Sequence, residues 1–256
     1  MRTGKVRKGY KIKMILQAEH ISKSYGEKQV LQDISVHLDE GELVCLLGVS
    51  GVGKTTLFNI LSGLLLPDSG KVLLEQEDVT GMSGNLSYML QKDLLLPHKT
   101  VLDNVALPLI LKGMKKKEAR EQVEIYFSQF GLEGTEKKYP VQLSGGMRQR
   151  AALLRTYMCG DKVALLDEPF SALDTLTRTA VQEWYLKVME EIKLSTLFIT
   201  HDIDEAILLS DRIYIMSGNP AGISAEIMVD ESKPRDGDFL LSDTFMEYKR
   251  KIKSLL

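Results

Sequence analysis

The sequence has few cysteines, no excess of charge of either sign and no long apolar run, and each of these absences excludes a class of protein. Its two cysteines, Cys45 and Cys159, give no metal-ligand spacing and predict a reduced, cytosolic chain. The 33 basic residues nearly balance the 35 acidic ones, so we expect no nucleic-acid partner. No apolar run approaches the roughly 18 residues of a membrane-spanning helix, so any membrane partner must be a separate polypeptide.

The composition is that of an ordinary globular protein, with 44% hydrophobic and 27% charged residues. The length fits one large α/β domain with an embedded subdomain. Residues 1–14 are rich in lysine and arginine without a following apolar segment, which is not the pattern of a signal peptide. We expect a basic, solvated tail there. Met14 is an alternative start of the native protein, because the periodic pattern begins directly after it.

The spacing of apolar residues predicts an opening rich in β-strands. Residues 15–47 alternate short apolar runs with turns and end in a buried strand at Leu43–Leu47. After a glycine-rich stretch at 48–53, apolar residues from Leu57 to Leu64 repeat at helical spacing, which predicts a strand, a loop and a helix in succession. Further strands are expected at 71–74, 86–90, 163–166, 196–200, 213–216 and 223–229.

A mainly helical region interrupts the strands between about residues 92 and 158. Within it, 116–130 has the pattern of an amphipathic helix that Gly131 can end, and a second helix is expected after Gly146. Later helices are expected at 175–192, from Asp202 and at 239–256. This order predicts an α/β fold with a β-rich N-terminal part, a mostly parallel core sheet and an inserted helical subdomain at about 92–158.

Residues 48–55 read Gly-Val-Ser-Gly-Val-Gly-Lys-Thr, which is the phosphate-binding loop pattern, and they lie between a predicted strand and a predicted helix. The glycines allow backbone N–H groups to face phosphates, and the helix N-terminus adds positive potential. Lys54 is expected to reach the terminal phosphates and the Thr55 hydroxyl to bind Mg²⁺. The motif predicts nucleotide binding, although on this motif alone a small-molecule kinase is an alternative.

The strand at 163–166 delivers two carboxylates, Asp167 and Glu168, to the edge where α/β sheets bind their ligands. Asp167 is placed to hold hydrated Mg²⁺. Glu168, expected to point in the opposite pleat direction, is placed to polarise the attacking water as a general base. The alternative is a solvated acidic turn, which the upstream phosphate loop disfavours.

Ser144, Gly145 and Gly146 precede a basic helical segment and form the most informative motif. Ser144 can cap this helix, whose N-terminus would present free N–H groups to a second anion. A single nucleotide on the phosphate loop's own helix does not account for that second site. Taken by itself, the segment is an ordinary helix N-cap.

From about residue 15 onward these motifs resemble the ABC ATPase family, and they follow its order. The matching positions are the phosphate loop, the signature at 143–147, the pair Asp167-Glu168, Gln91, the segment Ser171-Ala172-Leu173-Asp174 and His201. The resemblance implies the fold of a P-loop NTPase cassette that hydrolyses ATP. It also implies a head-to-tail homodimer, in which each ATP lies between the phosphate loop of one chain and the Ser144 segment of the other.

The same resemblance implies roles for residues whose ordinary interpretation is a solvated or structural side chain. Glu168, His201 and Gln91 would be catalytic, with His201 contacting the γ-phosphate and Gln91 relaying occupancy to the membrane subunit. Tyr25 would stack on adenine, as bases stack on aromatic side chains. The implied metal ligands are Thr55, Gln91 and Asp167. The implied nucleotide contacts are Tyr25, Gly48, Ser50, Gly51, Gly53, Lys54, Thr55, Thr56, Ser144, Gly145, Gly146 and Asp174.

Phe170, which follows Asp-Glu-Pro, resembles importer cassettes, and the segments around 95–105 and 174–178 look most like the nitrate, sulfonate and taurine importer branch. The chain departs from that branch between Arg155 and Lys162. The implied partners are integral membrane permease subunits and, indirectly, an extracytoplasmic solute-binding protein. The implied place is the cytoplasmic face of the cell membrane. A soluble, non-transport ABC ATPase acting as an assembly factor, and an exporter cassette, are the alternatives.

Overall fold

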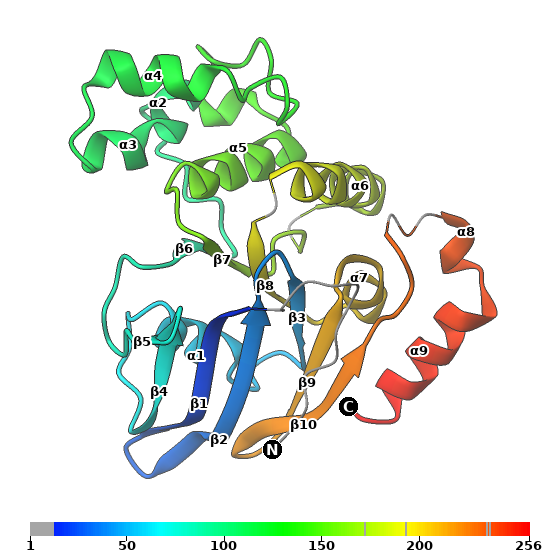
Figure 1. The fold of residues 1–256 in the computed structure, drawn as a ribbon. Helices are drawn as coiled ribbons and strands as arrows, with labels where there is room; N and C mark the ends of the chain where they lie inside the picture. The colour runs from blue at the N-terminus through cyan, green and yellow to red at the C-terminus, as the bar shows by residue number, and fades with distance from the viewer. Residues whose placement is uncertain (1–12, 172, 193, 234, 236) are drawn as a thin grey trace.

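The computed structural model describes residues 13–171, 173–192, 194–233, 235 and 237–256 (Figure 1). Most of the expected basic tail therefore lies outside the described residues, as does Ala172 of the segment 171–174. The described strands form a single sheet in the order β5-β4-β1-β2-β10-β9-β3-β8-β7-β6. Among the described helices, none is long and apolar enough to cross a membrane.

One half of the sheet is antiparallel and confirms the β-rich opening. β1 (Met14–Tyr25) and β2 (Lys28–Asp39) form a hairpin that turns at Gly26, whose φ of 60° favours glycine. β4 (Ser69–Leu74) pairs antiparallel with the other side of β1, and β5 (Glu77–Asp78) lies at the edge. This hairpin brings Tyr25 to the end of the sheet nearest the phosphate loop.

The other half is the core sheet, and its central strands are parallel. β3 (Leu43–Leu47), β7 (Val163–Asp167) and β8 (Ser195–Thr200) are buried along their whole length, as expected for parallel strands covered on both faces. β6 (Ser87–Met89) pairs parallel with β7, and β9 (Arg212–Gly218) pairs parallel with β3. β10 (Ala221–Met228) returns antiparallel to β9 and joins the two halves through β2.

The two faces of the core sheet carry separate apolar clusters, because side chains alternate along a strand. Val44 and Leu46 of β3 pack with the cluster that contains helix α1 (Lys54–Leu61). Cys45 and Leu47 pack with the cluster on the opposite face, which contains the helices of the inserted region. α1 is shorter than expected, since Gly63 takes a left-handed φ of 73° and Leu64 is 63% exposed.

The inserted region contains α2 (Val101–Val105), α3 (Leu107–Leu111), α4 (Lys116–Glu124), a short 3-10 helix at Pro140–Gln142 and α5 (Gly145–Tyr157). Figure 1 shows these helices beyond the β6–β7 end of the sheet. The expectation of one helix over 116–130 is wrong beyond Glu124. Phe127 and Phe130 are buried at helical spacing, but the backbone that carries them is a series of turns.

The remaining helices are α6 (Thr175–Ile192), α7 (Ile203–Leu209), α8 (Gly237–Leu240) and α9 (Asp243–Lys253). α6 matches the expected bounds. The single C-terminal helix expected over 239–256 is wrong, because Ser242 breaks it and caps α9 by accepting a hydrogen bond from the Phe245 amide at 3.1 Å. Phe245 and Ile252 of α9 are buried in the core.

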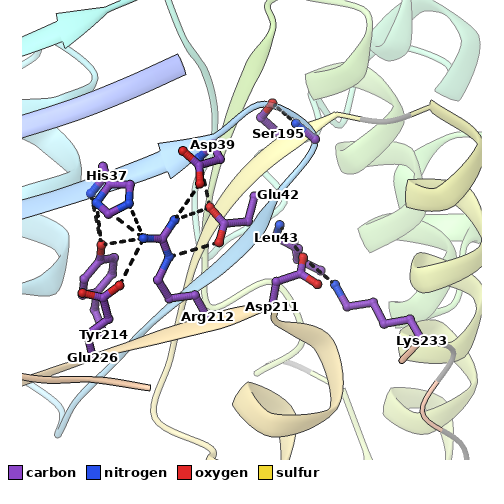
Figure 2. Close-up of polar contacts among 11 residues, drawn as sticks. His37, Asp39, Glu42, Leu43, Ser195, Asp211, Arg212, Tyr214, Glu226 and Lys233 are labelled. Carbon is purple, nitrogen blue, oxygen red and sulfur yellow. Dashed lines mark hydrogen bonds and ion pairs between the residues drawn. The ribbon is translucent and has the colours of Figure 1, made fainter. Parts of the chain in front are cut away.

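A buried cluster around Arg212 links β2, β9 and β10 to the residue that precedes β3, at the end of the sheet opposite the phosphate loop (Figure 2). The Arg212 side chain is 4% exposed, and its Nε donates to Glu42 Oε1 at 3.0 Å. Its other partners are His37, Asp39, Tyr214 and Glu226. Burial alone would lower the pKa of Arg212, but the hydrogen bond and charge of Glu42 raise it, so the guanidinium stays charged.

Candidate active site

The phosphate loop leaves β3 at Leu47 and enters α1 at Lys54. Gly51 and Gly53 have φ values of 80° and 117°, which favour glycine. A side chain at Gly53 would also meet Leu31 at 2.8 Å. Among the residues that the structure describes, no side chain caps the N-terminus of α1. The loop therefore turns backbone N–H groups and the positive end of a helix toward the same space, an arrangement suited to an anion.

The Lys54 side chain folds back against the loop, and the residue is 5% exposed. Its ammonium donates to the carbonyls of Gly48 and Val49 at 2.7 and 2.9 Å. Burial lowers the pKa of Lys54, while the charges of Glu168 and Asp167 act to raise it. The cation is thus held at the mouth of the loop, between backbone oxygens and two carboxylates.

Thr55 and Asp167 meet beside Lys54. The Thr55 hydroxyl donates to Asp167 Oδ2 at 3.1 Å, although the two residues are 112 positions apart in the chain. Asp167, the last residue of β7, is 6% exposed. Burial raises the pKa of Asp167 and the charge of Glu168 adds to the effect, while the hydrogen bond from Thr55 opposes it. A carboxylate in this position is stabilised by a cation.

Glu168 has both carboxylate oxygens engaged. Oε1 lies 3.1 Å from His201 Nδ1, and Oε2 accepts from Gln91 Nε2 at 3.1 Å. The expected reason for its direction, strand pleating, is wrong, because β7 ends at Asp167 and Glu168 has a left-handed φ of 45°. Such a conformation is costly for glutamate and is found most often at functional sites. The structure thus brings Gln91, Glu168 and His201 together.

A cavity of about 290 Å³ lies over the phosphate loop and reaches Gln91 and Glu168, whereas the predicted residues Gly48 and His201 lie outside its lining. It is lined by Tyr25, Val30, Ser50, Gly51, Gly53, Lys54, Thr55, Thr56, Gln91, Asp167, Glu168 and Ile199. Tyr25 is 53% exposed, which leaves a face of its ring open to a ligand. Val30 and Ile199 were not predicted as site residues, since an apolar residue within a strand gives no signal that separates a ligand contact from the core.

The Ser144 segment lies apart from this cavity. Ser144 caps α5, with its hydroxyl accepting from the Met147 amide at 3.2 Å, and it is exposed. Within the part of the chain that the structure describes, Ser144, Gly145, Gly146 and Asp174 are absent from the cavity lining. Ser144 at the N-terminus of α5 is thus exposed, although Gly146 is buried, and this N-terminus does not line the cavity over the phosphate loop of its own chain.

Comparison with known proteins decides the family. A family model described as ABC transporter matches residues 31–171, which includes the phosphate loop, the Ser144 segment and the two carboxylates. The chain belongs to the ABC transporter family. As a cassette of this family it binds ATP and hydrolyses it to drive transport.

Three curated relatives are similar over most of their length. The formylaminopyrimidine import ATP-binding protein ThiZ of Halalkalibacterium halodurans is 43% identical, covering 85% of this chain and 86% of the relative. The aliphatic sulfonates import ATP-binding protein SsuB of Bacillus cereus is 40% identical, covering 92% and 91%. The nitrate import ATP-binding protein NrtD of Synechocystis is 36% identical, covering 90% and 89%.

A solved structure of the ABC cassette MJ0796 is similar in fold, with a TM-score of 0.73 and 28% identity. The match covers 85% of this chain and 100% of that one. That structure is a dimer in a post-hydrolysis state, bound to ADP and Pi. The mixed sheet with antiparallel N-terminal strands and interspersed helices is thus the ABC cassette fold.

Proposed function

We propose that this cassette is the motor subunit of an ABC importer, and that ATP-driven closure of a homodimer is coupled to uptake of a small solute through a separate permease. The observation that carries the proposal is the Glu168 carboxylate, held between Gln91 and His201 at the edge of the cavity over the phosphate loop. A base fixed at this edge can reach a water beside a terminal phosphate.

Several residues in and beside the cavity have separate roles in this proposal. Lys54 and the N–H groups of the loop bind the β- and γ-phosphates, and Lys54 exchanges the carbonyls of Gly48 and Val49 for phosphate oxygens. Glu168 accepts the proton of the attacking water. His201 and Gln91 orient that carboxylate, and Tyr25 stacks on the adenine.

The chemistry of Thr55, Asp167 and Gln91 fits Mg²⁺. All three offer hard oxygen donors, and burial of the Asp167 carboxylate gives it a need for a cation. In the described residues no group of three or more His, Cys, Asp or Glu side chains could hold a metal by itself, which suits an ion that takes further ligands from the nucleotide. Bound there, Mg²⁺ would neutralise charge on the phosphates.

The separation of Ser144 from the cavity supports a head-to-tail dimer. A second chain would place its exposed α5 N-terminus over the nucleotide and would complete two sites by symmetry. The dimeric, nucleotide-bound MJ0796 cassette is consistent with this arrangement. Asp174, which precedes α6, would then lie near the partner chain.

The relatives named for import of formylaminopyrimidine, aliphatic sulfonates and nitrate favour a small nitrogen- or sulfur-containing solute. In this proposal the solute never contacts the cassette, because the permease and an extracytoplasmic binding protein select it. The cassette would then act at the cytoplasmic face of the membrane.

The test is reconstitution of a tagged cassette with the transmembrane proteins that co-purify with it. Proteoliposomes should take up labelled nitrate, an alkanesulfonate or a pyrimidine precursor in the presence of ATP, and the same solute should stimulate phosphate release. A cassette that hydrolyses ATP but recovers no transmembrane partner would favour a soluble assembly factor. ATP-dependent efflux would favour an exporter.

A further inference from the structure

α6 lies between two loops that the proposed mechanism uses. The segment 171–174 precedes α6, and the loop with His201 precedes α7. Arg178, in the first turns of α6, contacts both. Its Nη2 donates to the Leu173 carbonyl at 3.0 Å, and its Nη1 lies 3.6 Å from Asp202 Oδ2. One guanidinium therefore joins the loop expected at the partner interface to the residue next to His201.

Asp202 holds the start of α7 as well. Its Oδ1 accepts hydrogen bonds from the amides of Asp204 and Glu205 at 2.9 and 3.2 Å, which makes it the N-cap of α7. Its Oδ2 is the atom nearest Arg178. A movement of the guanidinium would thus pull on the carboxylate that fixes the helix following His201.

A second polar contact lies one turn further along α6. Gln182 Nε2 donates to Glu205 Oε1 at 2.7 Å, and the two residues are 9% and 6% exposed. Burial raises the pKa of Glu205, whereas hydrogen bonds from Thr200 and Gln182 lower it. Figure 1 places α6 and α7 on the same side of the sheet. α7 is therefore anchored to α6 by a buried hydrogen bond and, at its N-terminal end, by a partly exposed ion pair.

We propose that Arg178 is a positioning residue that couples the segment 171–174 to His201. The inference rests on the proposed function, because it takes Glu168 as the base and the segment 171–174 as part of the dimer interface. When a partner seats on that segment, the Leu173 carbonyl and the guanidinium move together. Asp202 follows, and the contact that His201 already makes with Glu168 is held in place. Hydrolysis thereby depends on the presence of the partner.

The geometry suits arginine rather than lysine. A planar guanidinium donates in two directions at once, to a carbonyl and to a carboxylate, while an ammonium is a point charge. Arg178 Nε is buried and has no hydrogen-bond partner in the described part of the chain. This N–H group can therefore form a further hydrogen bond if the side chain moves. The ion pair between Arg178 and Asp202, at 3.6 Å, is longer than a hydrogen bond, so the guanidinium can move toward the carboxylate.

The test compares Arg178→Met, Arg178→Lys, Asp202→Asn and the double variant Arg178→Met/Asp202→Asn in the full chain. Asn caps helices as well as Asp does, so Asp202→Asn removes the charge and keeps the cap. We expect Arg178→Met and Asp202→Asn each to lower kcat by about 10- to 100-fold, the effect of a displaced catalytic group. KM for ATP should be unchanged, and the Hill coefficient for ATP should fall toward one.

The double variant should be no slower than the slower single variant, within about twofold, because both changes break one coupling. Arg178→Lys should recover part of kcat. Additive losses, or a higher KM with normal kcat, would overturn the inference. If Arg178→Met fails to fold, Asp202→Asn with normal kcat overturns it. A failure of the proposed function can be told apart from a failure of this inference. If Glu168 is not the base, ATP turnover persists in the single variant Glu168→Gln, whatever the Arg178 variants do.

Discussion

His201 and Glu168 lie within hydrogen-bonding distance, 3.1 Å from Nδ1 to Oε1, although they are 33 residues apart in the chain. They meet because β7 and β8 are parallel neighbours and each residue follows the carboxyl end of its strand closely. With Gln91 on the other oxygen, the carboxylate has one orientation rather than many. In the proposed function this carboxylate is the base, and a base fixed in this way loses little entropy when it accepts a proton.

Replacement of Glu168 by Gln should slow ATP turnover by about 100-fold or more, since a positioned general base contributes about 10²–10⁴. ATP binding should persist, because Lys54 and the loop are unchanged. Size-exclusion chromatography with ATP should then show an accumulated dimer. Glu183→Gln, the same chemical change at an exposed position of α6, is the control and should behave as the unmodified chain. Turnover within a few-fold of normal in Glu168→Gln would assign the base elsewhere.

Replacement of Asp167 by Asn should stabilise the nucleotide-free chain at pH 7.5 while abolishing Mg²⁺-dependent turnover. Burial raises the pKa of Asp167, so its stabilising contribution is present below the ordinary aspartate pKa, near 4, and is lost as pH rises through its folded value. The variant avoids that loss. A gain of about 1 kcal/mol would raise Tm by about 2–4 °C.

The Tm difference between the Asp167→Asn variant and the unmodified chain should shrink as the pH is lowered toward about 4, because Asp167 of the unmodified chain becomes increasingly protonated. Differential scanning calorimetry at the two pH values measures it. A Tm below that of the unmodified chain at pH 7.5 would show that the carboxylate is favoured in the folded state, against the stated direction.

Tyr25→Ala should weaken ATP binding by about 1–3 kcal/mol, the effect of losing one base–aromatic stack. Tyr25→Phe should bind nearly as well, because the ring remains. Inorganic tripolyphosphate has no base, so its binding should be equal in all three chains. Isothermal titration with each ligand checks this. A loss of tripolyphosphate affinity in Tyr25→Ala would indicate a damaged loop instead of a lost stack.

The phosphate loop could be placed from the sequence because its signals are local. The predicted strand Leu43–Leu47 is β3, and α1 begins at Lys54, directly after the glycine-rich stretch that was expected to precede a helix. The carboxyl-end rule for parallel strands also predicted that Asp167 would lie near this loop. In contrast, the pattern at 116–130 failed, since buried Phe127 and Phe130 keep helical spacing although turns carry them.

The contacts that depend on strand order could not be predicted from the sequence. Arg212 and Glu42 are 170 residues apart and meet only because β9 lies beside β3. The left-handed backbone of Glu168 has no sequence signal, since glutamate rarely adopts it. The contact of Arg178 with Asp202 likewise needs α6 and α7 to lie on one side of the sheet. The motifs were sufficient to predict which residues form the site, whereas the contacts between them depend on the order of the strands in the fold.

Removal of Arg212 should be among the most destabilising single changes. Arg212→Ala leaves Glu42 and its neighbours without their cation, and breaking a buried ion pair costs about 3–5 kcal/mol. Chemical denaturation should show the loss. Arg250→Ala, at an exposed position of α9, should change stability by less than about 0.5 kcal/mol. If both changes lowered stability equally, solvent rather than Arg212 would be neutralising these acidic side chains.

Ser144 allows the helix cap and the proposed contact with the partner's nucleotide to be separated. Ser144→Asp keeps a good N-cap for α5, so the stability of the isolated chain should be unchanged. Its carboxylate would face the γ-phosphate bound to the partner, and like charges there should prevent closure. With ATP, the double variant Glu168→Gln/Ser144→Asp should then remain monomeric, whereas Glu168→Gln with the native Ser144 should form dimers.

Ser144→Ala is the matched control, because it removes the cap and adds no charge. It should cost about 0.5–2 kcal/mol of stability yet still dimerise with ATP, since the N–H groups of the α5 N-terminus remain. If Ser144→Asp dimerised normally, the α5 N-terminus would not face the nucleotide. Ser144→Asp should thus keep its stability and lose ATP-dependent dimerisation, whereas Ser144→Ala should lose stability and still dimerise. A purely structural role for Ser144 would not produce these opposite results.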